Sequence, residues 1–154
     1  MAYRNIVLQG DPILKKKSRN VEKFDDKIKL LVEDMKETMY KNDGVGLAAV
    51  QVGILKRIFI VDIGEGLNVF INPEIEQMSG EYIDNEGCLS FPGKLYKVRR
   101  PKMVKVKAQD ENGKEFEIEA EDLFARAICH ENDHLNGIVF LDHVRSEDQD
   151  DNKG

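Results

Sequence analysis

Two histidines and a glutamate stand together in a run that could bind and use a metal ion. His130 and His134 lie four residues apart, and Glu131 directly follows the first of them. On a helix, residues i and i+4 share one face, with β-carbons about 5–6 Å apart, so both imidazoles can bind one ion. Glu131 lies one step round the helix, where it can reach a metal-bound water but is badly placed as a ligand. An isolated histidine pair more often lies on a solvated face or in a satisfied core pair, but the intervening glutamate favours a metal-dependent hydrolase.

A third ligand is needed, because catalytic metal sites of this kind use three protein ligands and leave one position for water. The candidates by residue type are Cys88, Cys129 and His143. Cys129 adjoins His130, so on a helix it points about 100° away from that ligand. His143 lies beyond the expected end of the helix. Cys88 lies between β-rich segments and can approach the helix freely, so we favour Cys88 and keep His143 as the alternative.

Two helices are expected to hold these residues in place. Residues 25–41 predict a helix, because their apolar residues recur at 3.6-residue spacing. Residues 123–135 predict a second helix that carries the histidines. Asp122 is expected to cap its start, and Asn136-Gly137 is expected to end it.

Between the helices, the periodicity changes to that of strands. The runs 57–62 and 67–71 are rich in β-branched and aromatic residues. Residues 102–109 and 115–120 alternate between apolar and polar types, and Asn112-Gly113 between them is a hairpin signal. The order of elements predicts an α+β fold in which antiparallel strands pack around a central, metal-binding C-terminal helix, with an additional N-terminal helix.

Length and composition limit the possible classes of protein. The chain has 154 residues, of which 41% are hydrophobic and 34% charged, and this suits one folded domain. We expect residues 1–145 to form a single catalytic domain and residues 146–154 to form an acidic, mobile tail. The formal net charge of −6 disfavours direct nucleic-acid binding. No run approaches the roughly 20 apolar residues of a membrane span, and no secretory signal is visible, so we expect a cytoplasmic location.

Three short segments carry a pattern that extends beyond the histidine run. They are residues 44–51 (Gly-Val-Gly-Leu-Ala-Ala-Val-Gln), 86–90 (Glu-Gly-Cys-Leu-Ser) and 130–134 (His-Glu-Asn-Asp-His). Together and in this order, they resemble the peptide deformylase family, and the likeness covers nearly the whole chain. The resemblance implies a bacterial hydrolase that removes the N-formyl group from the initiator methionine of nascent polypeptides and releases formate.

The resemblance also implies roles for individual residues in the reaction. The positions that match the family's metal ligands are Cys88, His130 and His134. Glu131 matches its general acid/base. The Gln51 side chain and the backbone N–H of Leu89 match its oxyanion donors.

A further set of positions is expected to bind the substrate, and its members are Val45, Gly46, Glu86 and Ala127. Glycine here allows a peptide backbone to approach closely. Ala127 lies about one helical turn before His130, in the wall of an expected methionine pocket. Glu86 also resembles one half of a family ion pair, with Arg100, that supports the cysteine loop.

The resemblance implies one divalent metal ion, with ferrous iron in the cell and zinc, nickel or cobalt possible in the purified protein. The expected partners are N-formylmethionyl peptides and, transiently, the ribosome, with no membrane involved. The chain departs from the family in two places. Cys129 stands where many members have glutamine, and by helix geometry it faces away from the metal. The region after the histidine run is also short.

Two other classes of protein remain open from the sequence. A zincin-type metallopeptidase uses the same histidine run and would not require Cys88 or Gln51. A structural metal module would have a closed fourth position, filled by Cys129 or His143, and no need for Glu131.

Overall fold

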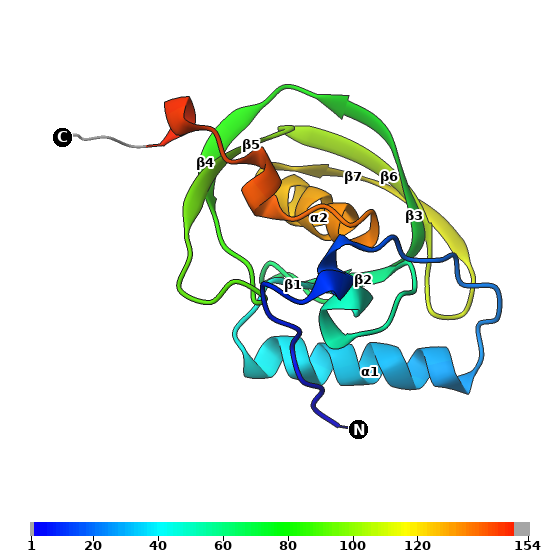
Figure 1. The fold of residues 1–154 in the computed structure, drawn as a ribbon. Coiled ribbons are helices and arrows are strands. Elements are labelled where there is room, and N and C mark those ends of the chain that lie inside the picture. Colours follow the sequence, from blue (N-terminus) through cyan, green and yellow to red (C-terminus); the bar gives the residue numbers. More distant parts are fainter. Residues whose placement is uncertain (1, 150–154) are drawn as a thin grey trace.

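A five-stranded antiparallel sheet, a two-stranded sheet and two helices make up residues 2–149, the part that the computed structural model describes (Figure 1). The larger sheet has the strand order β1-β2-β3-β6-β7. Its strands are β1 (Gly46–Ala48), β2 (Ile58–Val61), β3 (Asn68–Ser79), β6 (Met103–Gln109) and β7 (Glu115–Glu121). The smaller sheet pairs β4 (Tyr82–Glu86) with β5 (Tyr96–Arg100). The predicted α+β fold with antiparallel strands is therefore confirmed.

The β6–β7 hairpin forms as the alternating sequence predicts. Its register runs from Met103 opposite Glu121 to Gln109 opposite Glu115. In the turn, the Asp110 carboxylate accepts hydrogen bonds from backbone N–H groups two and four residues further on. Every second residue of β6 is buried, so one face of the hairpin faces the core and the other faces solvent.

Strand β2 is buried on both faces, which explains its continuous apolar sequence. Phe59 and Val61 belong to the cluster of buried side chains that surrounds α2 (Asp122–Leu135). Ile58 and Ile60 belong to the cluster beneath α1 (Asp26–Lys41). The sheet therefore separates the two helices and buries a layer of side chains against each of them.

The predicted helices form within a residue of the expected limits. Asp25 caps α1, and its side chain accepts a hydrogen bond from Ile28 N. Figure 1 shows α2 at the centre of the molecule, enclosed by strands, with α1 outside β1 and β2. Arg57 holds the end of α2 by donating to Leu135 O and to the Asn136 side chain. Neither α1 nor α2, nor any other helix within residues 2–149, is long and apolar enough to cross a membrane.

The predicted cap of α2 is wrong. Asp122 is the first helical residue rather than the cap, and its side chain pairs with Lys102 at 2.7 Å on the surface. Its backbone has φ of 56°, in the left-handed region that aspartate adopts more readily than most residues. Glu121 occupies the cap position and makes no capping hydrogen bond with its side chain.

The beginning of the predicted acidic tail lies against β5. Residues Ser146–Asp148 form a short 3-10 helix, and the buried Asp148 accepts hydrogen bonds of 2.7–2.9 Å from Arg99. The Gln149 side chain then bonds both backbone polar groups of Lys97. These contacts fix residues 146–149 on the edge of the small sheet. The rest of the predicted tail, residues 150–154, lies outside the described residues, and a domain boundary at residue 145 stays a prediction.

Candidate metal centre

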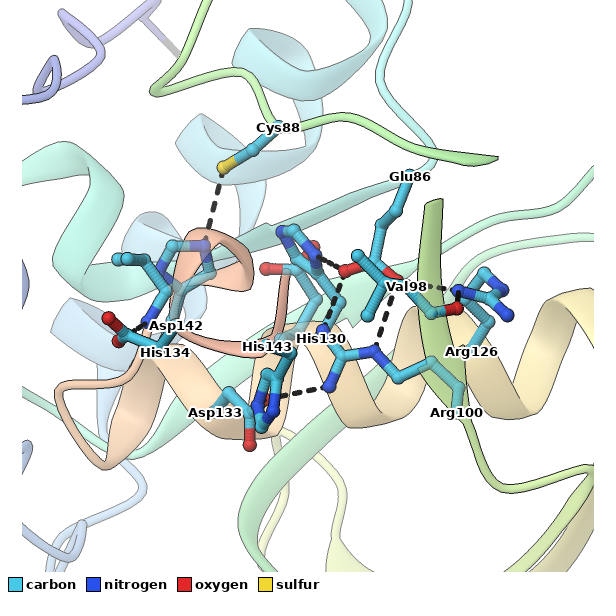
Figure 2. Close-up of polar contacts among 12 residues, drawn as sticks. Glu86, Cys88, Val98, Arg100, Arg126, His130, Asp133, His134, Asp142 and His143 are labelled. Carbon is cyan, nitrogen blue, oxygen red and sulfur yellow. Dashed lines mark hydrogen bonds and ion pairs between the residues drawn. The ribbon is translucent and has the colours of Figure 1, made fainter. Parts of the chain in front are cut away.

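Three side chains far apart in the sequence meet beside α2. The Sγ atom of Cys88 and one ring nitrogen each of His130 and His134 all lie within 4.8 Å of one another. Cys88 Sγ is 3.4 Å from His134 Nε2 (Figure 2). A tetrahedral ion with bonds of about 2.1 Å to nitrogen and 2.3 Å to sulfur would separate such ligands by roughly 3.6 Å. The donor types and their spacing therefore fit one divalent ion.

The two imidazoles are buried, and their pKa values shift in opposite directions. Burial by itself lowers the pKa of His130, but Glu131, the Cys88 sulfur and Glu86 outweigh burial and raise this pKa to about 10. Burial and the positive charge of His130 hold the pKa of His134 well below its usual value. One positive charge is therefore favoured between the two rings, in a place where a bound cation would supply it.

Glu86, at the end of β4, fixes the orientation of His130. One carboxylate oxygen accepts a hydrogen bond of 2.6 Å from His130 Nδ1, which leaves Nε2 of that ring for a metal. Arg100 binds both oxygens of the carboxylate, at 3.0 and 2.6 Å, and Arg126 binds one of them at 2.9 Å. Burial raises the pKa of Glu86, but the hydrogen bonds from His130 and Arg100 outweigh burial and hold it far below the usual range. The predicted pair with Arg100 is present, and the carboxylate has no oxygen left over for a peptide.

Glu131 is buried beside the histidines and aims one oxygen at β1. Its Oε2 lies 4.0 Å from His130 Nε2, and its Oε1 has no hydrogen-bond partner within residues 2–149. A β-carbon added at Gly46 would lie 2.6 Å from Glu131 Oε2, so a larger residue at this position would force the carboxyl group to shift. Burial raises the pKa of Glu131 to about 7. A carboxyl group with this pKa can both accept and return a proton near neutral pH.

Gln51 reaches the centre from the short 3-10 helix Ala49–Val52, which follows β1. Its carbonyl oxygen accepts from Ala48 N at 3.0 Å, so the amide nitrogen is turned towards the cysteine loop. That nitrogen donates to Ser90 Oγ at 3.1 Å and lies 3.5 Å from Cys88 Sγ. Next to the cysteine, the backbone N–H of Leu89 makes no hydrogen bond within the described part of the chain.

A pocket of about 260 Å³ opens directly over these groups. Its walls come from the segment before β1, from the end of β4 with the cysteine loop, and from one face of α2. They include all four residues predicted to bind substrate, which are Val45, Gly46, Glu86 and Ala127. Cys88, Leu89, His130 and Glu131 also line the pocket. The structure thus brings the predicted substrate positions and two of the candidate metal ligands, Cys88 and His130, to one cavity, with the third, His134, buried beside them.

The alternative ligands are elsewhere. His143 lies in a 3-10 helix after α2, and its Nε2 is 2.9 Å from Asp133 Oδ2. It is absent from the group of possible metal ligands in the described residues. Cys129 packs among the apolar residues of the main core, and burial raises the pKa of its thiol to about 11. The prediction that Cys129 faces away from the metal position is confirmed.

Sequence reasoning missed Arg126 and Ser90. Arg126 is buried on α2, donates to Glu86 and to Val98 O, and stacks on the Tyr82 ring at 4.7 Å. An arginine on the apolar face of a central helix is a signal that could have been used, because buried arginine is almost always paired. No sequence signal distinguishes Ser90 from an ordinary loop serine.

An α+β fold with a Cys-His-His group that could hold a metal ion, a glutamate beside it and a pocket next to it is typical of metal-dependent hydrolases. Comparisons with known proteins give the family. Residues 3–150 match the polypeptide deformylase family. The peptide deformylase of Clostridium botulinum is 63% identical over 142 residues, which are 92% of this chain and 97% of that protein. Peptide deformylase 1 of Clostridium acetobutylicum is 61% identical over 92% of this chain and 95% of its own length.

Solved structures agree with the sequence comparisons. The crystal structure of peptide deformylase from Thermotoga maritima superposes with a TM-score of 0.91 at 46% identity, covering 94% of this chain and 99% of that one. A Synechococcus elongatus peptide deformylase, solved in complex with actinonin, has a TM-score of 0.91 at 41% identity and covers 93% and 79% of the two chains. The chain belongs to the polypeptide deformylase family.

Proposed function

We propose that this protein removes the N-formyl group from the initiator methionine of nascent polypeptides and releases formate. The observation that carries the proposal is that Cys88, His130 and His134 lie within 4.8 Å of one another, beside a pocket that Glu131 also lines, in a chain of this family. The proposed ligands are Cys88 Sγ and the Nε2 atoms of the two histidines. A divalent ion bound there supplies Lewis acidity, which lowers the pKa of a coordinated water to near 7.

Glu131 moves the proton in this proposal. Its carboxylate accepts a proton from the water that attacks the formyl carbon. The C–N bond then breaks, Glu131 returns the proton to the departing α-amine, and formate leaves. The pKa of about 7 suits both steps, because the group is neither fully protonated nor fully ionised at neutral pH.

Two N–H groups are proposed to stabilise the negative charge on the formyl oxygen during attack. The Gln51 amide nitrogen is already directed at the Cys88 sulfur, and the Leu89 N–H has no competing acceptor within residues 2–149. Losing one such donor typically costs about 10²–10³ in rate. The bond from Ala48 N to Gln51 Oε1 prevents the amide from turning its oxygen towards the developing charge.

The pocket is proposed to take the methionine side chain and the start of the peptide. Val45 and Ala127 supply apolar wall, and β1 is an end strand of the larger sheet, so an extended peptide is proposed to pair along its outer edge. Gly46 keeps this edge accessible beside Glu131. Because the Glu86 carboxylate is held by two arginines and a histidine, we assign any peptide contact of this residue to its backbone.

The metal, the partners and the location are also proposals. One thiolate and two imidazoles accept several borderline ions, so we propose ferrous iron in the cell and zinc, nickel or cobalt as replacements in the purified protein. The proposed partners are N-formylmethionyl nascent chains, with transient proximity to the ribosome. The bacterial relatives support a bacterial cytoplasmic location.

The direct test compares two peptides that differ only in the N-terminal formyl group. The metal-loaded protein is incubated with formyl-Met-Ala-Ser and with Met-Ala-Ser, and formate and peptide fragments are quantified. We expect stoichiometric formate from the first peptide and intact second peptide. Cleavage of a peptide bond without formate would favour a metallopeptidase instead. No product from either peptide, at full metal content, would contradict the proposal.

A further inference from the structure

A row of hydrogen-bonded charged side chains connects the buried metal centre with the surface. His130 donates to Glu86, Glu86 pairs with Arg100, and Arg100 Nη1 donates to Asp133 Oδ2 at 2.7 Å. The same Asp133 oxygen accepts from His143 Nε2 at 2.9 Å (Figure 2). The first three members are buried, whereas the side chain of His143 is 41% exposed.

Each member of this row restrains the next. Arg100 uses Nε and Nη2 for Glu86 and Nη1 for Asp133, so its planar group is held from two sides. The Asp133 side chain accepts hydrogen bonds from Arg100 and from His143 on the same oxygen, Oδ2. The orientation of this carboxylate therefore depends on both donors. A residue that hydrogen-bonds to a metal-ligating histidine sets the orientation of the ring and its strength as a ligand. Because Glu86 bonds both Arg100 and His130, the position of Arg100 influences the orientation of the His130 ring.

His143 is itself held in place from the metal side. It ends the 3-10 helix Phe140–His143, whose first residue is buried. The Phe140 ring packs against the His130 ring with centroids 5.9 Å apart and against Phe91 at 5.5 Å. The short helix therefore contacts His130 through Phe140 at one end and Asp133 through His143 at the other.

We propose that His143 is a positioning residue for the metal centre, acting through Asp133, Arg100 and Glu86 on His130. This inference rests on the proposed function only in identifying His130 as a metal ligand. The required group is the Nε2–H donor. A glutamine, whose amide nitrogen occupies a similar place, should therefore replace His143, whereas alanine and asparagine should not. If His143 only filled space, the effect of a substitution would not depend on whether the new side chain places an N–H donor near Asp133.

The test measures metal affinity without substrate. Parent, His143→Gln, His143→Asn and His143→Ala proteins are titrated with Co²⁺ against a competing chelator, and the visible spectrum of bound Co²⁺ is recorded. Removing a direct partner of a metal-ligating histidine costs about 10–100-fold in affinity, so His143, which lies three contacts beyond the direct partner Glu86, should cost less, about 5-fold. We expect this weakening and an altered spectrum for alanine and asparagine, with glutamine close to the parent.

Lys15→Ala is the matched control. It removes the exposed 3.4 Å pair with Asp142 on the same 3-10 helix but touches no member of the row. Parent-like affinity and spectrum are expected for this variant. Parent-like Co²⁺ binding in His143→Ala, or equal losses in the glutamine and alanine variants, would overturn the inference. Because the readout is Co²⁺ binding, weaker binding in a protein that releases no formate would support the inference while contradicting the proposed function.

Discussion

The β6–β7 hairpin and the polar interior beside α2, which consists of Glu86, Arg100 and Arg126, place their charged residues in opposite ways. On the hairpin, Lys105 pairs with Glu117 at 3.6 Å on the solvent face, while Val104 and Val106 fill the core. In the polar interior, Glu86 and Arg100 are themselves buried and take the place of apolar side chains. The hairpin is therefore held by apolar burial with charges outside, and the metal centre by charges inside.

This difference teaches where the chain is sensitive to substitution. A surface ion pair contributes little to stability, because solvent screens it and two flexible side chains must be ordered. A buried pair gains little overall as well, but removing one partner leaves an uncompensated charge away from water. Substitutions in the polar interior are therefore expected to lower the stability of the fold. The function of these buried charges is to fix the orientation of His130.

The largest effect is expected from Glu86→Gln, which keeps the shape of the side chain and removes its charge. Arg100 and Arg126 would then lose their shared buried carboxylate. We expect the free energy of unfolding to fall by about 3–5 kcal/mol. Metal affinity should also fall, by about 10–100-fold. Denaturant unfolding of the metal-free protein and a metal titration measure the two quantities.

Glu117→Gln is the matched substitution on the hairpin. Its carboxylate is paired with Lys105 on the solvent face, so no resolvable change in stability or metal affinity is expected. If the Glu86 and Glu117 variants lost similar amounts of stability, the contrast between the two regions would be wrong.

A smaller loss of stability is expected from Phe70→Leu, which tests the apolar core rather than the buried charges. Phe70 is fully buried on β3 and stacks on Phe59 with ring centroids 4.8 Å apart. Replacing it should cost about 1–2 kcal/mol of unfolding free energy through imperfect packing. Because Phe70 takes no part in the hydrogen bonds through which Glu86 orients His130, metal affinity should stay within error of the parent. A weakened metal site in this variant would show that the two regions are coupled.

A smaller effect than that of Phe70→Leu is expected from Asp148→Asn, at the edge of the small sheet. Hydrogen bonds from Arg99 lower the pKa of Asp148 below its unfolded value of about 3.9. The pair therefore stabilises the folded chain above that pH, and its contribution disappears as the pH falls through the folded pKa. Parent and variant should differ in unfolding midpoint at pH 7 and converge as the pH falls through the lowered pKa of folded Asp148. A difference that persisted unchanged in acid would contradict this role of the pair.

The apolar half of the fold was predictable from the sequence, and the polar half was not. Helix α1 and the β6–β7 hairpin have regular periodicity because each buries one face. Strands β4 and β5 contain Glu86, Arg99 and Arg100, which break any apolar alternation. These residues are tolerated in place because Asp148, Asp133 and α2 supply partners from distant parts of the chain. Local sequence patterns cannot predict those partners, because the partners come from distant parts of the chain.

The candidate site divides in the same way. His130 and His134 are four residues apart on one helix with Glu131 between them, so this run by itself favoured a shared ion. Cys88 could be favoured but not fixed by geometry, since loop position left His143 open as a ligand. The contact between His143 and Asp133 depends on how the chain returns after Gly137, and no periodicity describes that return.

The central claim is that Glu131 performs proton transfer at a metal centre formed by Cys88, His130 and His134. Its most direct test is the rate of formate release from a formyl-Met peptide by Glu131→Gln and by the parent, at equal measured metal content. We predict that the variant binds metal as the parent does and that kcat falls by about 10²–10⁴-fold. Formate release at the parent rate by a fully metal-loaded Glu131→Gln protein would contradict the account.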